Sequence, residues 1–161
     1  MRNPVTHAVE RHDVSSVVAV AGHPIHAMSV AFPIALVVST LGCDVFYWWT
    51  GDPFWARAAL WASGFAFGLG IVAALSGTAE LLLVRGIRSR AASWTHAVAA
   101  MTLISIAGAN WGLRLTHGDT IVLPHGLFLS VLATIFVGLA GWHGGKLVFD
   151  HGIGMSLSEA E

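Results

Sequence analysis

Histidine is the residue type in this chain best suited to chemistry, and five of the 9 histidines are expected at one end of the folded molecule. The five are His23, His26, His96, His143 and His151. Imidazole binds haem iron, and it also suits zinc, copper and non-haem iron. An ionisable side chain near lipid is costly and commonly marks a functional site. The cluster therefore predicts a haem or metal site.

His26 and His96 are the preferred ligands. They belong to different predicted helices at similar depth, as two axial ligands of a b-type haem must. His96 with His143 forms a second reasonable pair. His23 and His26 have the i, i+3 spacing of residues on one helix face and could together bind a single ion. We treat His23, His143 and His151 as alternates to the preferred pair.

Glu80 is the acidic residue expected beside this cluster, because it ends the second apolar stretch at the same end. Its carboxylate is predicted to orient an imidazole through a hydrogen bond or to accept a proton. His117 and His125 flank the connection between the third and fourth stretches, at the opposite end. Loop residues at the membrane interface are the better interpretation of these two, although they could hold a second site.

Hydropathy defines the elements that must position these residues. The 161 residues are 55% hydrophobic and only 11% charged, with a mean hydropathy of +0.71, whereas soluble domains carry about 25% charged residues. Four stretches lack Asp, Glu, Lys and Arg: residues 24–43, 58–79, 91–113 and 120–145. Each reaches the roughly 20 residues that cross a bilayer as a helix. The net charge of −1 gives no indication of nucleic-acid binding, and a single cysteine excludes an internal disulfide.

The sequence therefore predicts an all-α integral membrane protein, a four-transmembrane-helix bundle. Its helices are expected at about residues 24–48, 54–84, 91–115 and 122–148. Three arginines in the loop between the second and third helices indicate that this loop and both termini are cytoplasmic. We expect a bacterial inner (cytoplasmic) membrane. The three regions are an N-terminal interfacial tail, the transmembrane domain and a C-terminal tail: residues 1–22, 23–150 and 151–161.

Other residues predict features of the helices. Asp52-Pro53 is typical of a helix start, with Asp52 as the cap. Pro33 is expected to kink the first helix and to free the carbonyl of Ser29. At the end away from the histidines, Asp44 is expected to pair with Arg57 or Arg114. Asn110 is expected to bond a neighbouring helix. Aromatic residues predict an interfacial belt at this end: Phe46, Tyr47, Trp48, Trp49, Phe54, Trp55, Trp61 and Trp111.

Two segments resemble the DUF2231 family of predicted membrane proteins. Segment 22–34 contains Gly-His-Pro-Ile-His and then Phe-Pro-Ile, and segment 144–154 reads Gly-Gly-Lys-Leu-Val-Phe-Asp-His-Gly-Ile-Gly. The resemblance covers about residues 22–154 and implies a four-helix membrane protein with histidines near the cytoplasmic face. It implies no activity.

The family pattern also bears on individual ligands. His23, His26, His96 and His151 fit it. His143 lies where the family implies an apolar residue, and Ala31 lies where the family often has another histidine. His143 could therefore replace the imidazole that is lost at position 31.

These observations lead to one preferred function. The chain is expected to bind haem b through His26 and His96 near the cytoplasmic face and to exchange electrons with quinone or with partner redox subunits. It is expected to act as an anchor or electron-transfer subunit, or as a homo-oligomer, rather than as a stand-alone enzyme. The alternatives are a histidine site for a Zn, Fe or Cu ion, used in binding or transport, and a structural membrane subunit without a cofactor.

Overall fold

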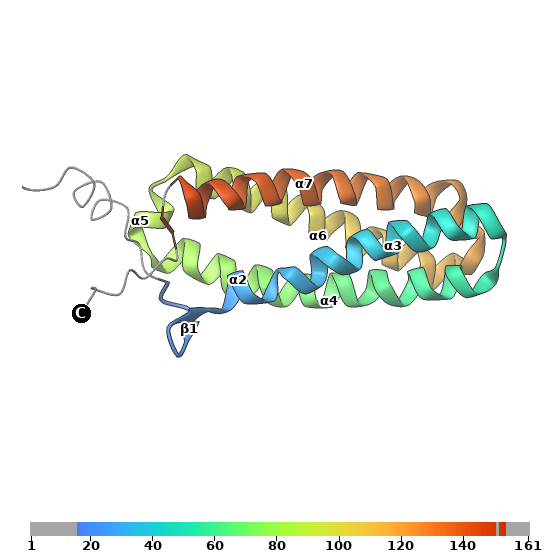
Figure 1. Cartoon of the computed structure of the whole chain (residues 1–161), viewed down its shortest axis with the longest axis horizontal. Coiled ribbons are helices and arrows are strands. Elements are labelled where there is room, and N and C mark those ends of the chain that lie inside the picture. The colour runs from blue at the N-terminus through green and yellow to red at the C-terminus, as the bar shows by residue number, and fades with distance from the viewer. Residues whose placement is uncertain (1–15, 151, 154–161) are drawn as a thin grey trace, which may run out of the picture.

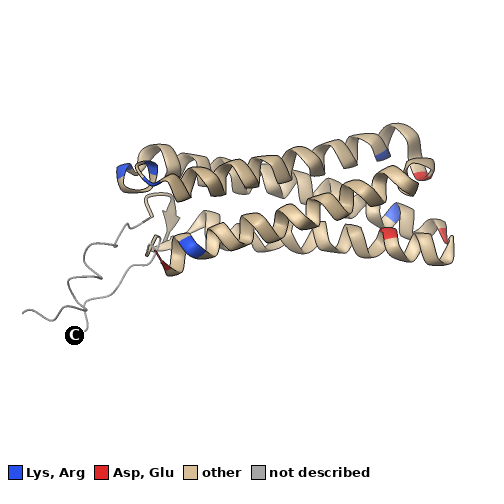
Figure 2. Cartoon of the chain, turned by 90° about the horizontal axis from the view of Figure 1, so that it is seen from above, with Lys and Arg blue, Asp and Glu red and all other residues tan. Residues whose placement is uncertain are grey.

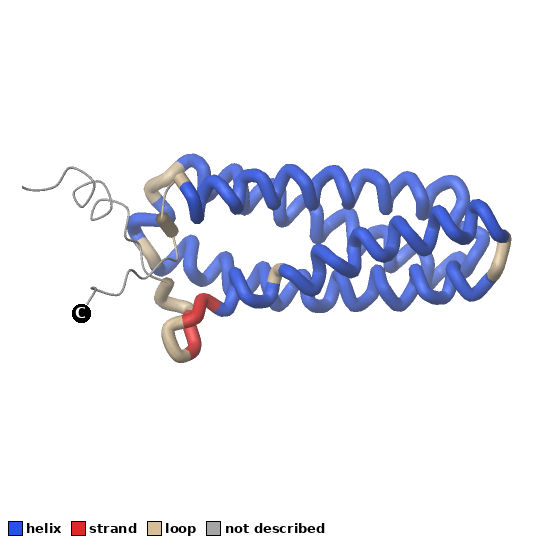
Figure 3. Tube along the Cα trace, viewed as in Figure 1, coloured by secondary structure: helices blue, strands red, loops and turns tan. Residues whose placement is uncertain are grey.

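Helices account for most of residues 16–150 and 152–153, the part of the chain that a computed structural model describes (Figures 1 and 3). Four long helices lie side by side: α3 Ala31–Thr50, α4 Pro53–Leu83, α6 Ala91–His117 and α7 Leu127–Phe149. One end carries short elements: β1 Ala19–Val20, β2 His23–Pro24, α2 Ile25–Ser29 and α5 Arg85–Arg88. The other end carries η1 Gly118–Ile121 and η2 Val122–Gly126.

Three continuous helical stretches of the described chain are long and apolar enough to cross a membrane: Ile25–Thr50, Pro53–Leu83 and Ala91–Phe149. The third stretch reverses direction at η1 and η2, so it contains both α6 and α7 (Figure 1). Charged residues gather at the two ends of the bundle, and none of those that the structure describes lies in its middle (Figure 2). The structure is that of a multi-pass membrane protein. The count of four crossings stays a prediction.

The four helices form two hairpins, and each helix of one hairpin contacts one helix of the other. α3 packs on α4 and α6 packs on α7, while α4 also contacts α6 and α7 contacts α3. α3 and α6 are therefore diagonal partners, as are α4 and α7. Small buried residues at the centre, Val37, Ala66 and Ala133, form a core cluster with four partly buried hydrophobic side chains: Leu36, Leu103, Ile106 and Val137.

Local sequence explains where several helices begin and end. The predicted start of α4 is confirmed, because Asp52 Oδ1 accepts a hydrogen bond of 2.8 Å from the Phe54 amide and Pro53 is the first helical residue. Pro33 has no amide to donate to the Ser29 carbonyl, and the helix is interrupted at Val30, between α2 and α3.

The start of the fourth helix differs from the predicted residue 122. Leu123 has an extended conformation (φ −119°, ψ 129°) inside η2, and α7 begins only at Leu127. The cause is local, because the residue before a proline is disfavoured in the helical region and Pro124 follows.

The aromatic end of the bundle carries both exposed and half-buried rings. Trp48, Trp49, Phe54 and Trp61 are exposed, as a belt facing lipid headgroups requires. Trp111 instead packs between α6 and α4: a Cβ at Gly64 would lie 2.7 Å from its Nε1 atom. Trp111 is half-buried, as Tyr47 and Trp55 are, and its place in the belt stays a prediction.

Candidate functional site at the histidine end

The rings of His26 and His96 meet inside the bundle. Their centroids are 6.1 Å apart and their planes make an angle of 78°. His26 lies on α2, which leads into α3, and His96 lies on α6, so the two rings come from diagonal helices. The structure thus brings together the two residues that were predicted as axial ligands.

Each ring is held by a backbone carbonyl of the neighbouring helix in its own hairpin. His26 Nδ1 lies 2.8 Å from the Ala73 carbonyl oxygen on α4, and His96 Nδ1 lies 3.0 Å from that of Ala140 on α7. A carbonyl oxygen only accepts, so each Nδ1 donates and carries the proton. The lone pair of each neutral ring is then on Nε2, which has no hydrogen-bond partner among the described residues. This is the usual arrangement of a metal-binding histidine and its supporting group.

The other predicted ligands lie in different surroundings. His23 belongs to β2, is exposed, and has its Nδ1 atom 2.9 Å from the Ala21 carbonyl oxygen. It therefore does not share a helix face with His26, contrary to the prediction, because the helix begins only at Ile25. His143 is half-buried on α7 within electrostatic range of His96, but the ring that meets His96 is that of His26. His151 lies outside the described residues.

Glu80 is buried beside the histidine pair, on α4. Its residue is 9% exposed, and its Oε1 atom has no hydrogen-bond partner in the described part of the chain. The backbone of Val18 hydrogen-bonds to the carboxyl group, and His26 lies within electrostatic range of it. Glu80 thus lies where it was predicted, with one buried carboxylate oxygen that has no hydrogen-bond partner among the described residues.

A second polar cluster is buried at the opposite end of the bundle. Arg114 Nη2 lies 2.7 Å from Asp44 Oδ2, so the predicted partner of Asp44 is Arg114 and not Arg57. Asn110 accepts a hydrogen bond of 2.9 Å from Arg114 Nε and donates one of 2.9 Å to Ser130 on α7, as predicted for this residue. Ser130 donates in turn to Asp44 Oδ2 at 2.6 Å.

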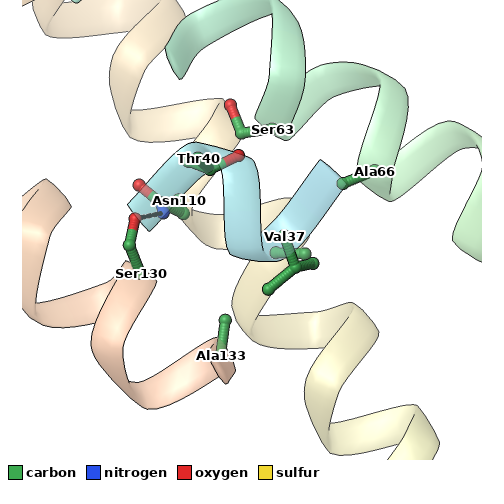
Figure 4. Close-up of a pocket in the computed structure, with 8 residues that line it drawn as sticks. Val37, Thr40, Ser63, Ala66, Asn110, Ser130 and Ala133 are labelled. Atoms are coloured by element: carbon green, nitrogen blue, oxygen red, sulfur yellow. Dashed lines mark hydrogen bonds between the residues drawn. The ribbon is translucent and has the colours of Figure 1, made fainter. Parts of the chain in front are cut away.

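Ser130 is the side chain of this polar cluster that the sequence did not indicate. A serine within an apolar helix is a weak signal, because small polar residues are common at helix contacts in membranes. Beside Asn110 and Ser130 lies a cavity of about 10 Å³ (Figure 4). Its other polar lining residues are Thr40 and Ser63, and it has the size of a single water molecule.

No group of three or more His, Cys, Asp or Glu side chains lies close enough to hold a metal ion within residues 16–150 and 152–153. His117 and His125, the two exposed histidines at the opposite end, do not belong to such a group either. His117 Nδ1 bonds to Thr116 and to the Leu113 carbonyl, at 2.7 and 3.1 Å, and His125 is exposed. Both residues are exposed, and their place at the membrane interface stays a prediction.

Comparison with known proteins adds one relationship. A family model described as Predicted membrane protein (DUF2231) matches residues 22–157. The chain has no match among curated proteins or among solved structures.

Proposed function

The chain belongs to the DUF2231 family of predicted membrane proteins, and we propose that it binds one haem b between His26 and His96 and transfers electrons in a membrane. The meeting of the two rings at a centroid distance of 6.1 Å carries this proposal. A coordinated imidazole nitrogen lies about 2 Å from its metal, so two rings on opposite sides of one ion have centroids roughly 6 Å apart. The spacing supports a shared ion.

The number of protein ligands favours haem over a bare ion. Structural zinc sites use four protein ligands and catalytic sites use three. The described residues supply a pair of imidazoles and no group of three donors. Haem iron takes its remaining ligands from the porphyrin, so two histidines suffice.

The surroundings of the pair suit ligation. The carbonyls of Ala73 and Ala140 fix which nitrogen is protonated and how each ring is turned. Such a hydrogen bond also raises the basicity of the nitrogen that binds the metal. When bound, haem would supply a one-electron redox couple, whose potential depends on its axial ligands and on burial.

We further propose that α3, α4, α6 and α7 each cross the bilayer. At about 1.5 Å per residue, α6 and α7, with 27 and 23 residues, are long enough for a hydrocarbon core of about 30 Å. Arg85, Arg88 and Lys146 lie at the histidine end, and Arg114 at the other end is neutralised by Asp44. The positive-inside rule then puts the histidine end and both termini on the cytoplasmic side of a bacterial inner membrane.

Electron transfer requires a donor and an acceptor. We propose quinone or a partner redox subunit, reached from the cytoplasmic half of the bundle, where the histidine pair lies. A homo-oligomer would bring two such sites into one assembly.

The test is the absorption spectrum of the full-length protein, purified in detergent and reconstituted with haemin. We expect a b-type reduced-minus-oxidised spectrum with two histidine ligands. His26→Ala and His96→Ala should each abolish the six-coordinate signature, and added imidazole should restore it if the variant is folded. His125→Ala, which removes an exposed ring at the other end, is the matched control.

A colourless protein that gains no Soret band from haemin would overturn the haem proposal. Metal analysis of the same preparation then decides between the alternatives. Glu80 gives the bare-ion alternative its one specific support, because its carboxyl group lies within electrostatic range of His26 and its Oε1 atom has no hydrogen-bond partner among the described residues. Stoichiometric Zn, Fe or Cu would indicate a histidine–carboxylate ion site. Absence of both haem and metal would indicate a structural subunit.

A further inference from the structure

The two hairpins of the bundle carry like residues at like positions. Seventy residues separate His26 from His96, and the same interval separates each of the pairs Ala27 and Ala97, Ile34 and Ile104, and Gly42 and Gly112. From α4 to α7 the interval is 67 residues, and it relates four further identical pairs: Ser63 and Ser130, Ala66 and Ala133, Ala73 and Ala140, and Gly77 and Gly144. These intervals relate α2 and α3 to α6, and α4 to α7.

The packing of the helices follows the same relationship. Within each hairpin the first helix packs on the second, and the second helix of each hairpin contacts the first helix of the other. This is the arrangement of two equivalent units about an axis that runs along the bundle. The cavity of about 10 Å³ fits it, because its eight lining residues are four related pairs (Figure 4): Val37 and Ala107, Thr40 and Asn110, Ser63 and Ser130, Ala66 and Ala133.

The two histidines are held by the same two contacts in the two hairpins. We call these contacts the seat of each ring: a hydrogen bond to a backbone carbonyl and close packing against a glycine. His26 bonds to the carbonyl of Ala73, and one helical turn further along α4 lies Gly77. A Cβ at Gly77 would lie 2.7 Å from His26 Nδ1 and 2.8 Å from its Cε1. His96 bonds to the carbonyl of Ala140, the residue related to Ala73, on α7.

Gly144 completes the second seat. It lies one turn beyond Ala140, and a Cβ there would lie 3.1 Å from His96 Cε1 and 3.3 Å from its Nδ1. Both rings thus lie against the bare backbone of a glycine while they bond to the carbonyl four residues earlier. The same pair of contacts is therefore observed twice independently, because one seat lies on α4 and the other on α7.

We propose that the chain contains two copies of one helical hairpin and that each copy positions one ligand of a site on their common axis. Gly77 and Gly144 are the positioning residues: they let His26 and His96 approach the carbonyls of Ala73 and Ala140. The functional part of this inference rests on the proposed role of the histidine pair.

Alanine substitutions test the two seats one at a time. Gly77→Ala must displace the ring of His26, because a contact of 2.7 Å is too short for a Cβ atom. Gly144→Ala should displace His96 less, because 3.1 Å can be relieved by a small shift. Alanine is the better helix former, so a general loss of helix is not the expected effect. Gly68→Ala on α4 and Gly141→Ala on α7 are matched controls, since a Cβ at either position meets nothing within 4 Å.

The first readout does not depend on haem. Imidazole nitrogen NMR of the full-length chain in detergent micelles, without added haem, reports which ring nitrogen of each histidine is protonated. In the parent chain both rings should be protonated at Nδ1. Gly77→Ala should lower the Nδ1–H to Nε2–H ratio of His26 about tenfold, the factor for loss of one hydrogen bond. His96 should keep its ratio in that variant, and a misfolded protein would change both.

The second readout is the electron paramagnetic resonance spectrum of the haemin-loaded protein, in which the two glycine variants should differ from their controls. If Gly77→Ala leaves the His26 protonation ratio the same as in Gly68→Ala, the proposal that glycine positions the ring is wrong. This outcome does not depend on whether the protein binds haem. If the ratio changes as expected but neither the parent nor any variant binds haem, the positioning role of the glycines is supported and the proposed haem function is wrong.

Discussion

Asp44 of α3 and Arg114 of α6 form an ion pair of 2.7 Å, and the side chains of both are at most 1% exposed. They hold equivalent positions in the two hairpins, separated by the same 70 residues as His26 and His96. One acid and one base at related positions neutralise each other where two like charges would repel. Asp44 Oδ1 and Arg114 Nη1 have no partner in the part of the chain that the structure describes. The pair therefore depends on the hydrogen bonds of Asn110 and Ser130.

Breaking this ion pair should be the most damaging change at its end of the bundle. Asp44→Asn leaves the guanidinium of Arg114 buried without an opposite charge, so we expect a loss of about 3–5 kcal/mol in the free energy of unfolding. Unfolding in mixed micelles, followed by circular dichroism, measures it. The double variant Asp44→Leu with Arg114→Met should lose less than Asp44→Asn alone, because no uncompensated charge remains.

Asp52→Asn provides the control for that experiment. It removes a carboxylate at the same end of the bundle, but Asn caps a helix as well as Asp does, so stability should change little. Equal losses for Asp44→Asn and Asp52→Asn would show that the buried ion pair does not stabilise the bundle.

Two aromatic rings pack on glycines where α4 meets α6, and these contacts predict a second effect on stability. A Cβ at Gly64 would lie 2.7 Å from Trp111 Nε1, and one at Gly108 would lie 2.7 Å from Phe67 Cε2. Gly64→Ala and Gly108→Ala should each lower the free energy of unfolding by about 1–3 kcal/mol through overpacking.

The matched variant is Gly112→Ala, one turn beyond Gly108 on the same helix, where a Cβ meets nothing within 4 Å. It should be neutral or slightly stabilising, because alanine favours helix. Thermal unfolding in detergent compares the three. If Gly112→Ala lowers the unfolding temperature as much as Gly108→Ala, packing against Phe67 is not the cause.

Glu80→Gln separates the haem proposal from the bare-ion alternative. The change keeps the side-chain volume and removes the carboxylate beside His26. Under the haem proposal the reduced-minus-oxidised spectrum should be unchanged, and the stability should be equal or higher, since a neutral amide costs less to bury than a charge.

Titration of the haem-free protein with Zn²⁺ supplies the opposing result. If the carboxylate is a metal ligand, Glu80→Gln should weaken Zn²⁺ binding about tenfold or more, in the range seen when groups of a metal site are removed. Tight zinc binding that depends on Glu80, in a protein that does not bind haem, would favour the bare-ion site.

The sequence predicts the helices well because membrane helices follow simple local rules. An apolar stretch of sufficient length must satisfy its backbone internally, and Asp52-Pro53 begins α4 at the predicted place. The start of α7 differs from the predicted residue 122 because η1 follows α6 directly and Leu123, which precedes Pro124, is extended inside η2. Hydropathy does not distinguish these turns from the helix that follows.

The candidate site was predictable only in part. Depth along a helix follows from the rise per residue, so the sequence placed His26, His96, His143 and Glu80 at one end. It left open which ring His96 meets, because that depends on how the helices are rotated and which of them are diagonal. The repeat of 70 and 67 residues is present in the sequence but gives only a weak signal, since so few positions of each hairpin are identical.

By itself the sequence determined that the chain is helical and apolar, where its polar residues lie along each helix, and that Asp44 requires a buried cation. Only the tertiary structure decided that this cation is Arg114, that His26 faces His96, and that His23 lies outside the helix. The reason is physical: composition and helical rise act along one helix, whereas contacts depend on the packing of all four. Backbone carbonyls and glycines then hold the two rings in place, and helix packing decides which carbonyls and which glycines do so.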